Sequence, residues 1–206
     1  MAHSAAEILR GLNQAKAPAQ CRYQDIFKLC ENCMDDVFAV QFNAFINGKS
    51  VSQVKRLLSE PNSRGLLPIH KLIKRDMNKA VALLLEWGKA FDLDYKVGRL
   101  TIMDALCQTN AIRDKMLRLV LSYTDDPDNN NGNSGFHPMV IFGGHEPSLI
   151  ALLDAGATVE ACMKRHPMLG GVFKERIYSA RRNWMAGRLH KDNLPNTVLR
   201  ARARQL

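Results

Sequence analysis

One motif recurs along this chain at a nearly fixed spacing. It begins at Gly65 in the segment GLLPIH, returns 33 residues later at Gly98 in GRLTIM, and returns after another 37 residues at Gly135 in GFHPMV. Each copy opens an apolar pattern with helical spacing, and a second such pattern follows it. Self-similarity at this period is typical of stacked repeats, in which each unit buries its apolar face against its neighbours.

The copies resemble the ankyrin repeat, which is a turn followed by two helices. The segment GLLPIHKLI is similar to the TPLHxA-like start of that repeat, and GGHEPSLIALLDAGATVEA resembles its second helix and Gly-Ala exit. A more degenerate copy spans residues 43–62, with Gly48 in its inter-helix turn and Leu57 and Leu58 on its buried face. The resemblance implies an all-α solenoid of about four degenerate repeats. A helical array of another repeat type is the alternative.

The resemblance also assigns roles to single residues. Pro68 falls in the first turn of a helix, where its missing N–H costs nothing. His70 falls on the family's histidine, which bonds to the backbone and orders the turn. Gly88 and Gly156 are expected to end helices in the left-handed conformation that glycine adopts at low cost.

The repeat assignment divides the chain into three parts: residues 1–35, 36–170 and 171–206. Helices over residues 4–16 and 23–34 are expected to cap the first repeat, because the end of a stack must cover its core. Pro167 is expected to open a partial fifth repeat. A last helix over residues 172–189 then caps the stack with an apolar face of Phe173, Ile177, Ala180 and Trp184.

All of the excess positive charge lies at the C-terminal end. The formal net charge is +9, and residues 164–206 hold eleven Lys or Arg and only two acidic residues. A basic end of this kind suggests a second function, which is binding of nucleic acid or an anionic membrane. The residues expected to serve it are Arg181, Arg182 and Arg188.

The cysteines and the N-terminus indicate a cytoplasmic protein. An odd count of five cysteines, without a signal-peptide pattern, is typical of reduced thiols. Cys30 and Cys33 form a single CxxC, and Cys162 and His166 form another isolated pair. Neither pair has the further ligands that zinc requires, so no metal or cofactor is expected and the thiols are expected to be free.

The sequence favours a protein–protein interaction module over an enzyme. It lacks phosphate-binding glycine loops, GxSxG and HExxH. Ankyrin stacks bind protein partners through the first-helix face and the hairpin tips, so we expect a monomeric adaptor. Small ankyrin proteins with divergent repeats also resemble effectors that bacteria inject into host cells, where the host cytosol would be the site of action. The implied partner-binding residues are Lys71, Lys74, Arg75, Phe91, Asp92, Tyr95, Lys96, Asp104, Gln108, Asp125, Asp126 and Asp128.

The repeat assignment predicts an all-helical circular dichroism spectrum. Helical patterns follow each other along the chain without strand-like alternation between them. Far-ultraviolet circular dichroism measures this directly, and a spectrum dominated by β-structure would end the ankyrin interpretation.

Overall fold

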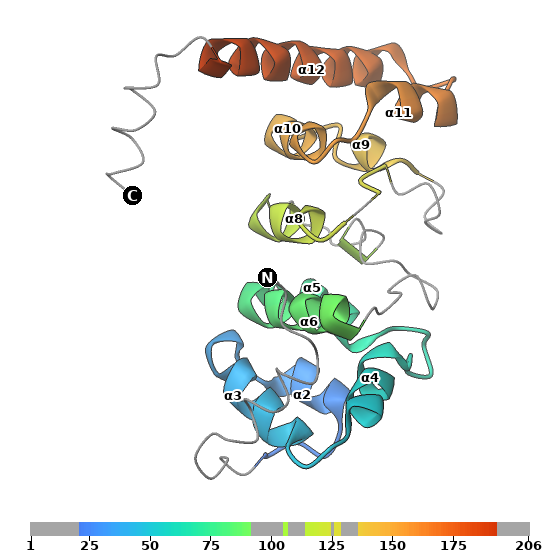
Figure 1. Ribbon diagram of the computed structural model, residues 1–206. Coiled ribbons are helices and arrows are strands. Elements are labelled where there is room, and N and C mark those ends of the chain that lie inside the picture. The colour runs from blue at the N-terminus through green and yellow to red at the C-terminus, as the bar shows by residue number, and fades with distance from the viewer. Residues whose placement is uncertain (1–20, 92–104, 107–113, 125, 129–135, 193–206) are drawn as a thin grey trace. The chain divides into compact units, whose positions relative to one another are not determined.

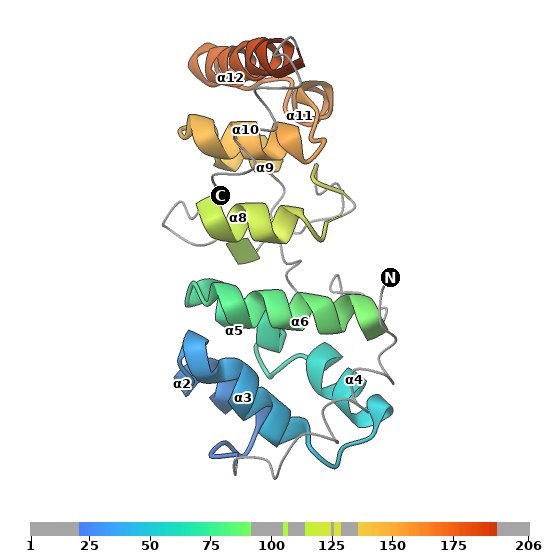
Figure 2. The same ribbon diagram turned by 60° about the vertical axis from the view of Figure 1, so that its left-hand side comes forward.

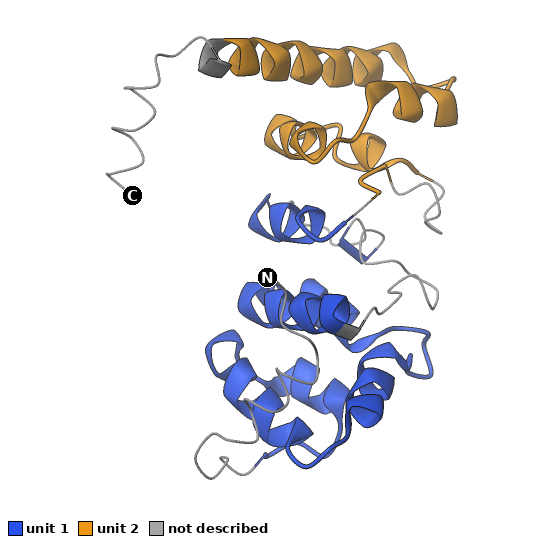
Figure 3. Cartoon of the chain, in the orientation of Figure 1, with its two compact units in different colours: residues 1–125, 129–135 blue, residues 126–128, 136–206 orange. Residues whose placement is uncertain are grey.

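The computed structural model describes residues 21–91, 105–106, 114–124, 126–128 and 136–192. These residues form helices, turns and connecting segments, and no strand occurs among them, so the expected all-α class is confirmed for this part of the chain. Contacts divide the chain into two compact units (Figure 3). Unit 1 comprises residues 1–125 and 129–135, and unit 2 comprises residues 126–128 and 136–206. The expected helix over residues 4–16 lies outside the described residues.

The described part of unit 1 contains two stacked helix pairs and two further helices. Helix α2 packs on α5 and α3 packs on α6, so the pair α2–α3 lies against the pair α5–α6 (Figures 1 and 2). Helix α8 packs on the other side of the stack, against α6. The helices are α2 (Ile26–Asn32), α3 (Asp35–Ile46), α4 (Val51–Ser59), α5 (Pro68–Lys74), α6 (Asn78–Phe91) and α8 (Asp114–Leu121).

The first helix pair differs from the one expected over residues 43–62. Helix α3 pairs with α2, which was expected to be a cap, and α4 lies to one side of the stack (Figure 2). The physical reason is the size of the buried face. Helix α3 buries three phenylalanines, Phe38, Phe42 and Phe45, whereas α4 buries only Val54 and Leu58. Leu57 is half-buried, and Gly48 lies in the turn between α3 and α4 with φ 76°.

The start of α5 has the hydrogen bond expected from its histidine. The backbone N–H of Leu67 donates to Nδ1 of His70 at 3.1 Å, inside the protein core. Pro68 occupies the first turn of the helix, where no donor is lost. After α5 the chain turns at Asp76, which adopts a left-handed φ of 60°.

The expectation for Gly88 was wrong. Helix α6 continues through Gly88 to Phe91, so Gly88 is a buried residue inside the helix and has no left-handed φ. A glycine inside a helix costs about 1 kcal/mol relative to alanine, which the burial of Val81, Leu84 and Leu85 on the same helix offsets.

Unit 2 contains helices α9 (Pro138–Ile141), α10 (Glu146–Asp154), α11 (Val159–Arg165) and α12 (Gly171–Asp192). Helix α11 packs on α9, and α12 packs on α10 and α11 (Figure 1). The last pair therefore begins at Val159, earlier than the expected start at Pro167. The physical reason is a cap, because the hydroxyl of Thr158 accepts a hydrogen bond from the backbone N–H of Ala161 at 3.2 Å.

None of the helices that the structure describes combines the length and apolar composition needed to cross a lipid bilayer.

The end of α10 confirms the expectation for Gly156. Its φ is 98°, a conformation that residues with a Cβ rarely adopt, and nothing lies within 4 Å of an added Cβ there. Gly187 in α12 also has open space around an added Cβ but lies within a helix. The two positions therefore separate the effect of backbone conformation from the effect of packing.

We expect Gly156→Ala to lower the free energy of unfolding by about 1–2 kcal/mol, because alanine is strained in this conformation. The matched control, Gly187→Ala, should raise it by up to about 1 kcal/mol because alanine favours the helix. Urea denaturation of both variants measures the difference. Equal effects of the two substitutions would mean that the turn does not depend on glycine.

Candidate interaction surface

Helix α12 carries a row of exposed apolar side chains. Ile177 and Ala180 are buried against unit 2, whereas Met185 is 48% exposed and Leu189 is 63% exposed. Tyr178, Met185 and Leu189 are spaced by seven and four residues, so they lie on one side of the helix. We call these three residues the α12 row. The apolar spacing of residues 172–189 predicts only a buried side, and their charges only a basic side, so the α12 row was not expected from the sequence.

The α12 row extends beyond the helix on which α12 packs. Nε1 of Trp184 donates a hydrogen bond to Oδ1 of Asp154, the last residue of α10, at 2.8 Å. Helix α12 continues to Asp192, about 12 Å further at 1.5 Å per residue (Figure 1). All residues from Met185 to Leu189 are exposed, so none of the described helices of unit 2 covers this segment.

Arginines flank the α12 row, and each of the three predicted for polyanion binding has an internal partner. Nη1 of Arg181 lies 2.7 Å from Oε1 of Glu160, and Nη2 of Arg182 lies 2.6 Å from Oε1 of Glu175. The guanidinium of Arg188 lies 4.8 Å from the ring centre of Trp184. Both ion pairs are solvent-exposed and therefore contribute little to stability, but they reduce the positive charge near the row.

The residues expected on the first-helix face of unit 1 have structural contacts. Nζ of Lys71 pairs with Oε1 of Glu31 at 2.5 Å. Nη1 of Arg75 donates to the backbone oxygens of Cys30 and Cys33 at 2.7 and 2.9 Å. Arg75 therefore binds the carbonyl end of α2 and joins it to the end of α5, which is a favourable place for a cation. Lys74 is exposed.

Most of the expected hairpin-tip residues lie outside the described part of the chain. These are Asp92, Tyr95, Lys96 and Asp125; the expected first-helix residues Asp104 and Gln108 lie outside it as well, and Phe91 is the last residue of α6. Asp126 and Asp128 are described, and both are half-buried. Asp128 was expected to face a partner, but its carboxylate is instead used within unit 2, because the neighbouring donors of His137 and Thr158 surround it.

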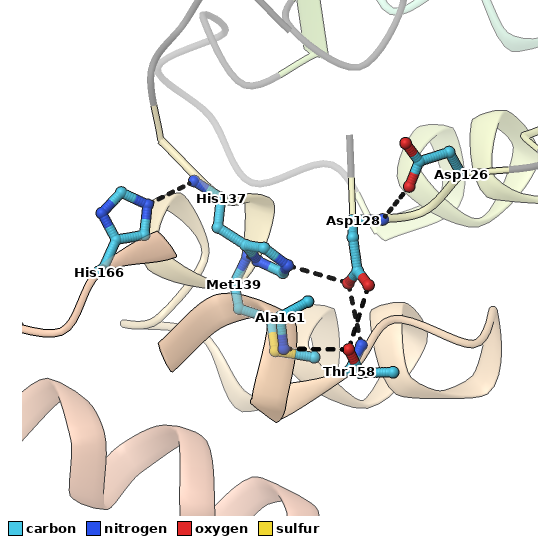
Figure 4. A network of polar contacts seen from close by, with 7 residues as sticks. All are labelled: Asp126, Asp128, His137, Met139, Thr158, Ala161 and His166. Atoms are coloured by element: carbon cyan, nitrogen blue, oxygen red, sulfur yellow. Dashed lines mark hydrogen bonds and ion pairs between the residues drawn. The ribbon is translucent and has the colours of Figure 1, made fainter. Parts of the chain in front are cut away.

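Asp128 is the centre of a polar network that joins three segments of unit 2 (Figure 4). Its carboxylate accepts hydrogen bonds from the backbone N–H of Thr158 at 2.9 Å, from Oγ1 of Thr158 at 3.1 Å and from Nε2 of His137 at 2.9 Å. Nδ1 of His137 accepts from the backbone N–H of Met139 at 3.1 Å and so caps α9. The backbone N–H of His137 donates to Nε2 of His166 at 2.9 Å.

This histidine–aspartate pair is arranged for structure. Because Nδ1 of His137 accepts a hydrogen bond, the proton of the neutral ring lies on Nε2, which donates to Asp128. The side chain is fully buried, and burial lowers the pKa of His137. Both ring nitrogens are therefore already engaged, and a general base needs one of them free to reach a substrate.

The described cysteines are free thiols, three of them buried. These three are Cys30, Cys33 and Cys162, while Cys21 is half-buried. Burial raises the pKa of Cys162 to about 11 and also raises the pKa values of Cys30 and Cys33. A thiol that stays protonated at neutral pH is a poor nucleophile. Among the described residues, no group of three His, Cys, Asp or Glu side chains could hold a metal ion.

No protein-family model matches this chain, and no curated protein or solved structure is significantly similar to it.

The histidines of the network predict acid sensitivity. Burial lowers the pKa of His137 and of His166, and Arg165 lowers both further, while Asp128 raises that of His137 without reversing the shift. The neutral rings are favoured in the folded state, so stability is complete above the unfolded pKa of about 6.5 and falls as the pH drops below it. We expect the melting temperature to decrease between about pH 7 and pH 5.

The control is the double variant His137→Asn with His166→Gln, whose amide oxygens can still accept the two backbone hydrogen bonds but do not titrate. Its melting temperature should be much less dependent on pH over this range, as measured by circular dichroism. An unchanged pH dependence would show that other groups cause the acid sensitivity.

Proposed function

We propose that this chain is a protein-binding module made of stacked helix pairs, and that a protein partner binds the α12 row. The observation that carries the proposal is the exposure of Met185 and Leu189 on a helix segment that continues past α10. Exposed apolar side chains on one side of a helix are typical of interaction sites, where their burial supplies binding free energy. A partner helix could pack along this side of α12.

We also propose that the helix pairs are degenerate ankyrin repeats. Three observations support it: the bond from Leu67 to His70, the left-handed turn at Gly156, and the packing of first helices on first helices and second helices on second helices within each unit. Ankyrin repeat proteins bind protein partners, which supports the proposal that this chain is a protein-binding module. The free thiols support a cytosolic partner, which for a translocated effector would be a host protein.

The partner-binding face proposed here differs from the first-helix face of unit 1. Lys71 and Arg75 are engaged with α2, so exchanging them would disturb the stack as well as any interface. Helix α12 instead offers apolar side chains together with Arg182 and Arg188. A partner with an apolar stripe and acidic residues at its edges fits this combination, since apolar contacts supply affinity and charges at the rim supply orientation.

Binding of a polyanion remains the second candidate because the net charge of residues 164–206 is positive. The ion pairs of Arg181 with Glu160 and of Arg182 with Glu175 weaken it, because each acidic partner would repel a phosphate. The sequence also places Glu175 on the same helix, so α12 is not uniformly basic.

Affinity capture with quantitative mass spectrometry tests the main proposal. We expect Met185→Asp with Leu189→Asp to reduce capture of a specific partner at least about tenfold, which corresponds to about 1.4 kcal/mol, with an unchanged melting temperature. The control is Met168→Asp, because Met168 is 94% exposed but lies outside the α12 row. The proposal is wrong if the row variant captures the same partner as efficiently as the control.

A titration of fluorescent nucleic acid and acidic liposomes tests the second candidate. If the basic end binds a polyanion, the logarithm of affinity should fall with the logarithm of salt concentration by roughly 0.7–0.9 for each phosphate neutralised. The variant Arg181→Glu, Arg182→Glu and Arg188→Glu should then remove binding. We expect the unaltered chain to bind nucleic acid and acidic liposomes only weakly. If the triple variant still captures the protein partner, the two functions are separate.

A further inference from the structure

Helix α3 has apolar side chains on a side that no described helix covers. Val37 is 47% exposed and Val40 is 55% exposed, and the half-buried Ala44 lies on the same side of the helix, seven residues after Val37 and four after Val40. We call these three residues the α3 row. Valines at this exposure on a helix in a terminal pair are unusual, because β-branched residues are not favoured on solvated helix surfaces.

The α3 row points away from the rest of unit 1. On the opposite side of α3, the carboxylate of Asp35 accepts hydrogen bonds from the backbone N–H groups of Lys79 and Ala80 at 3.1 and 2.8 Å, which caps the start of α6. The ring of Phe42 packs edge-on against Trp87 of α6 at 5.7 Å. Since a helix turns about 100° per residue, Val37, Val40 and Ala44 lie opposite Asp35 and Phe42.

Helix α12 mixes polar and apolar side chains on the side opposite the buried Ile177 and Ala180. Glu175, Ser179 and Arg182 lie there, and the exposed Leu189 follows Arg182 by seven residues. Terminal units of a stack need a polar outer face to remain soluble. The pair α2–α3 lacks such a face at the α3 row, so a further element is needed to cover it.

The first described residues of the chain lie next to the α3 row. The backbone N–H of Arg22 donates to Oε1 of Gln41 at 3.3 Å, and Gln41 is one helical turn after Val37. The described chain therefore begins beside the α3 row, at Cys21 and Arg22. The sequence before it places Ala5, Ile8, Leu9 and Leu12 at the spacing of one helix face, after a Ser4–Glu7 capping box.

We propose that residues 4–16 form a helix that docks Ile8, Leu9 and Leu12 on the α3 row. Thirteen residues of helix extend about 20 Å, whereas the row from Val37 to Ala44 extends about 10 Å, so the helix is long enough to cover it. Residues 17–20 span up to about 14 Å when extended, which is enough to turn back toward α3. The docked helix turns Glu7, Arg10 and Gln14 outward and gives this end of the stack a polar face.

Thiol labelling of the full chain tests this docking. A cysteine introduced by Val40→Cys is allowed to react with a maleimide, and mass spectrometry of the peptide that contains residue 40 separates it from the native cysteines. Ala39→Cys is the matched reference, because Ala39 is exposed and lies outside the α3 row. We expect the cysteine at position 40 to react at least about tenfold more slowly than that at position 39.

The segment is then altered in the same chain. Ile8→Asp with Leu12→Asp should raise the labelling rate at position 40 to that at position 39, while Arg10→Asp, on the outward side, should leave it low. Equal labelling at positions 39 and 40 without these changes overturns the proposal, even if the double variant fails to fold. Protection at position 40 that increases with protein concentration also overturns it, because a second copy would then cover the row. None of these outcomes depends on the α12 row.

Discussion

The first helix of each described helix pair is too short to be stable alone. Helices α2, α5 and α11 have seven residues each and α9 has four, whereas an isolated helix needs about 12–15 residues even with favourable composition. Each of them must therefore be held by contacts with another helix. Stacking of one pair on the next supplies those contacts, and it decides which residues become core, which cap helix ends and which are left exposed.

Capping of these short helices uses several chemical solutions. Asp25 caps α2 by accepting from the backbone N–H of Lys28, and Thr158 caps α11. Before α5, the backbone N–H of Leu67 donates a hydrogen bond to His70. At the start of α9, the side chain of His137 accepts the capping hydrogen bond and is itself held in place by Asp128. Asp128 also binds the residue that caps α11. One carboxylate thus links the starts of two helices, which makes unit 2 dependent on the protonation of buried histidines.

Helix α3 of unit 1 and helix α12 of unit 2 expose apolar side chains in different ways. The α3 row lies on the side opposite the stack, where a terminal unit needs a cover. The α12 row lies partly beyond the helix that supports α12, next to the polar side chains of Glu175 and Arg182. This difference in placement leads to different interpretations: an intramolecular contact for the α3 row and a partner-binding site for the α12 row. Both depend on the same rule, that a repeat unit buries its apolar face only against a neighbour.

The sequence by itself determined the helical class, the position of most helices and the turns at Gly48 and Gly156, because apolar spacing and turn residues act locally. It also determined the role of His70, whose bond partner lies three residues away. Only the tertiary structure decided which helices pair. The pairing of α3 with α2 and its packing on α6, where Phe42 meets Trp87, join residues far apart in the sequence, and local spacing does not contain such contacts. In the same way, Asp128 was expected at a partner-binding tip, but donors about 30 residues away in the sequence occupy its carboxylate.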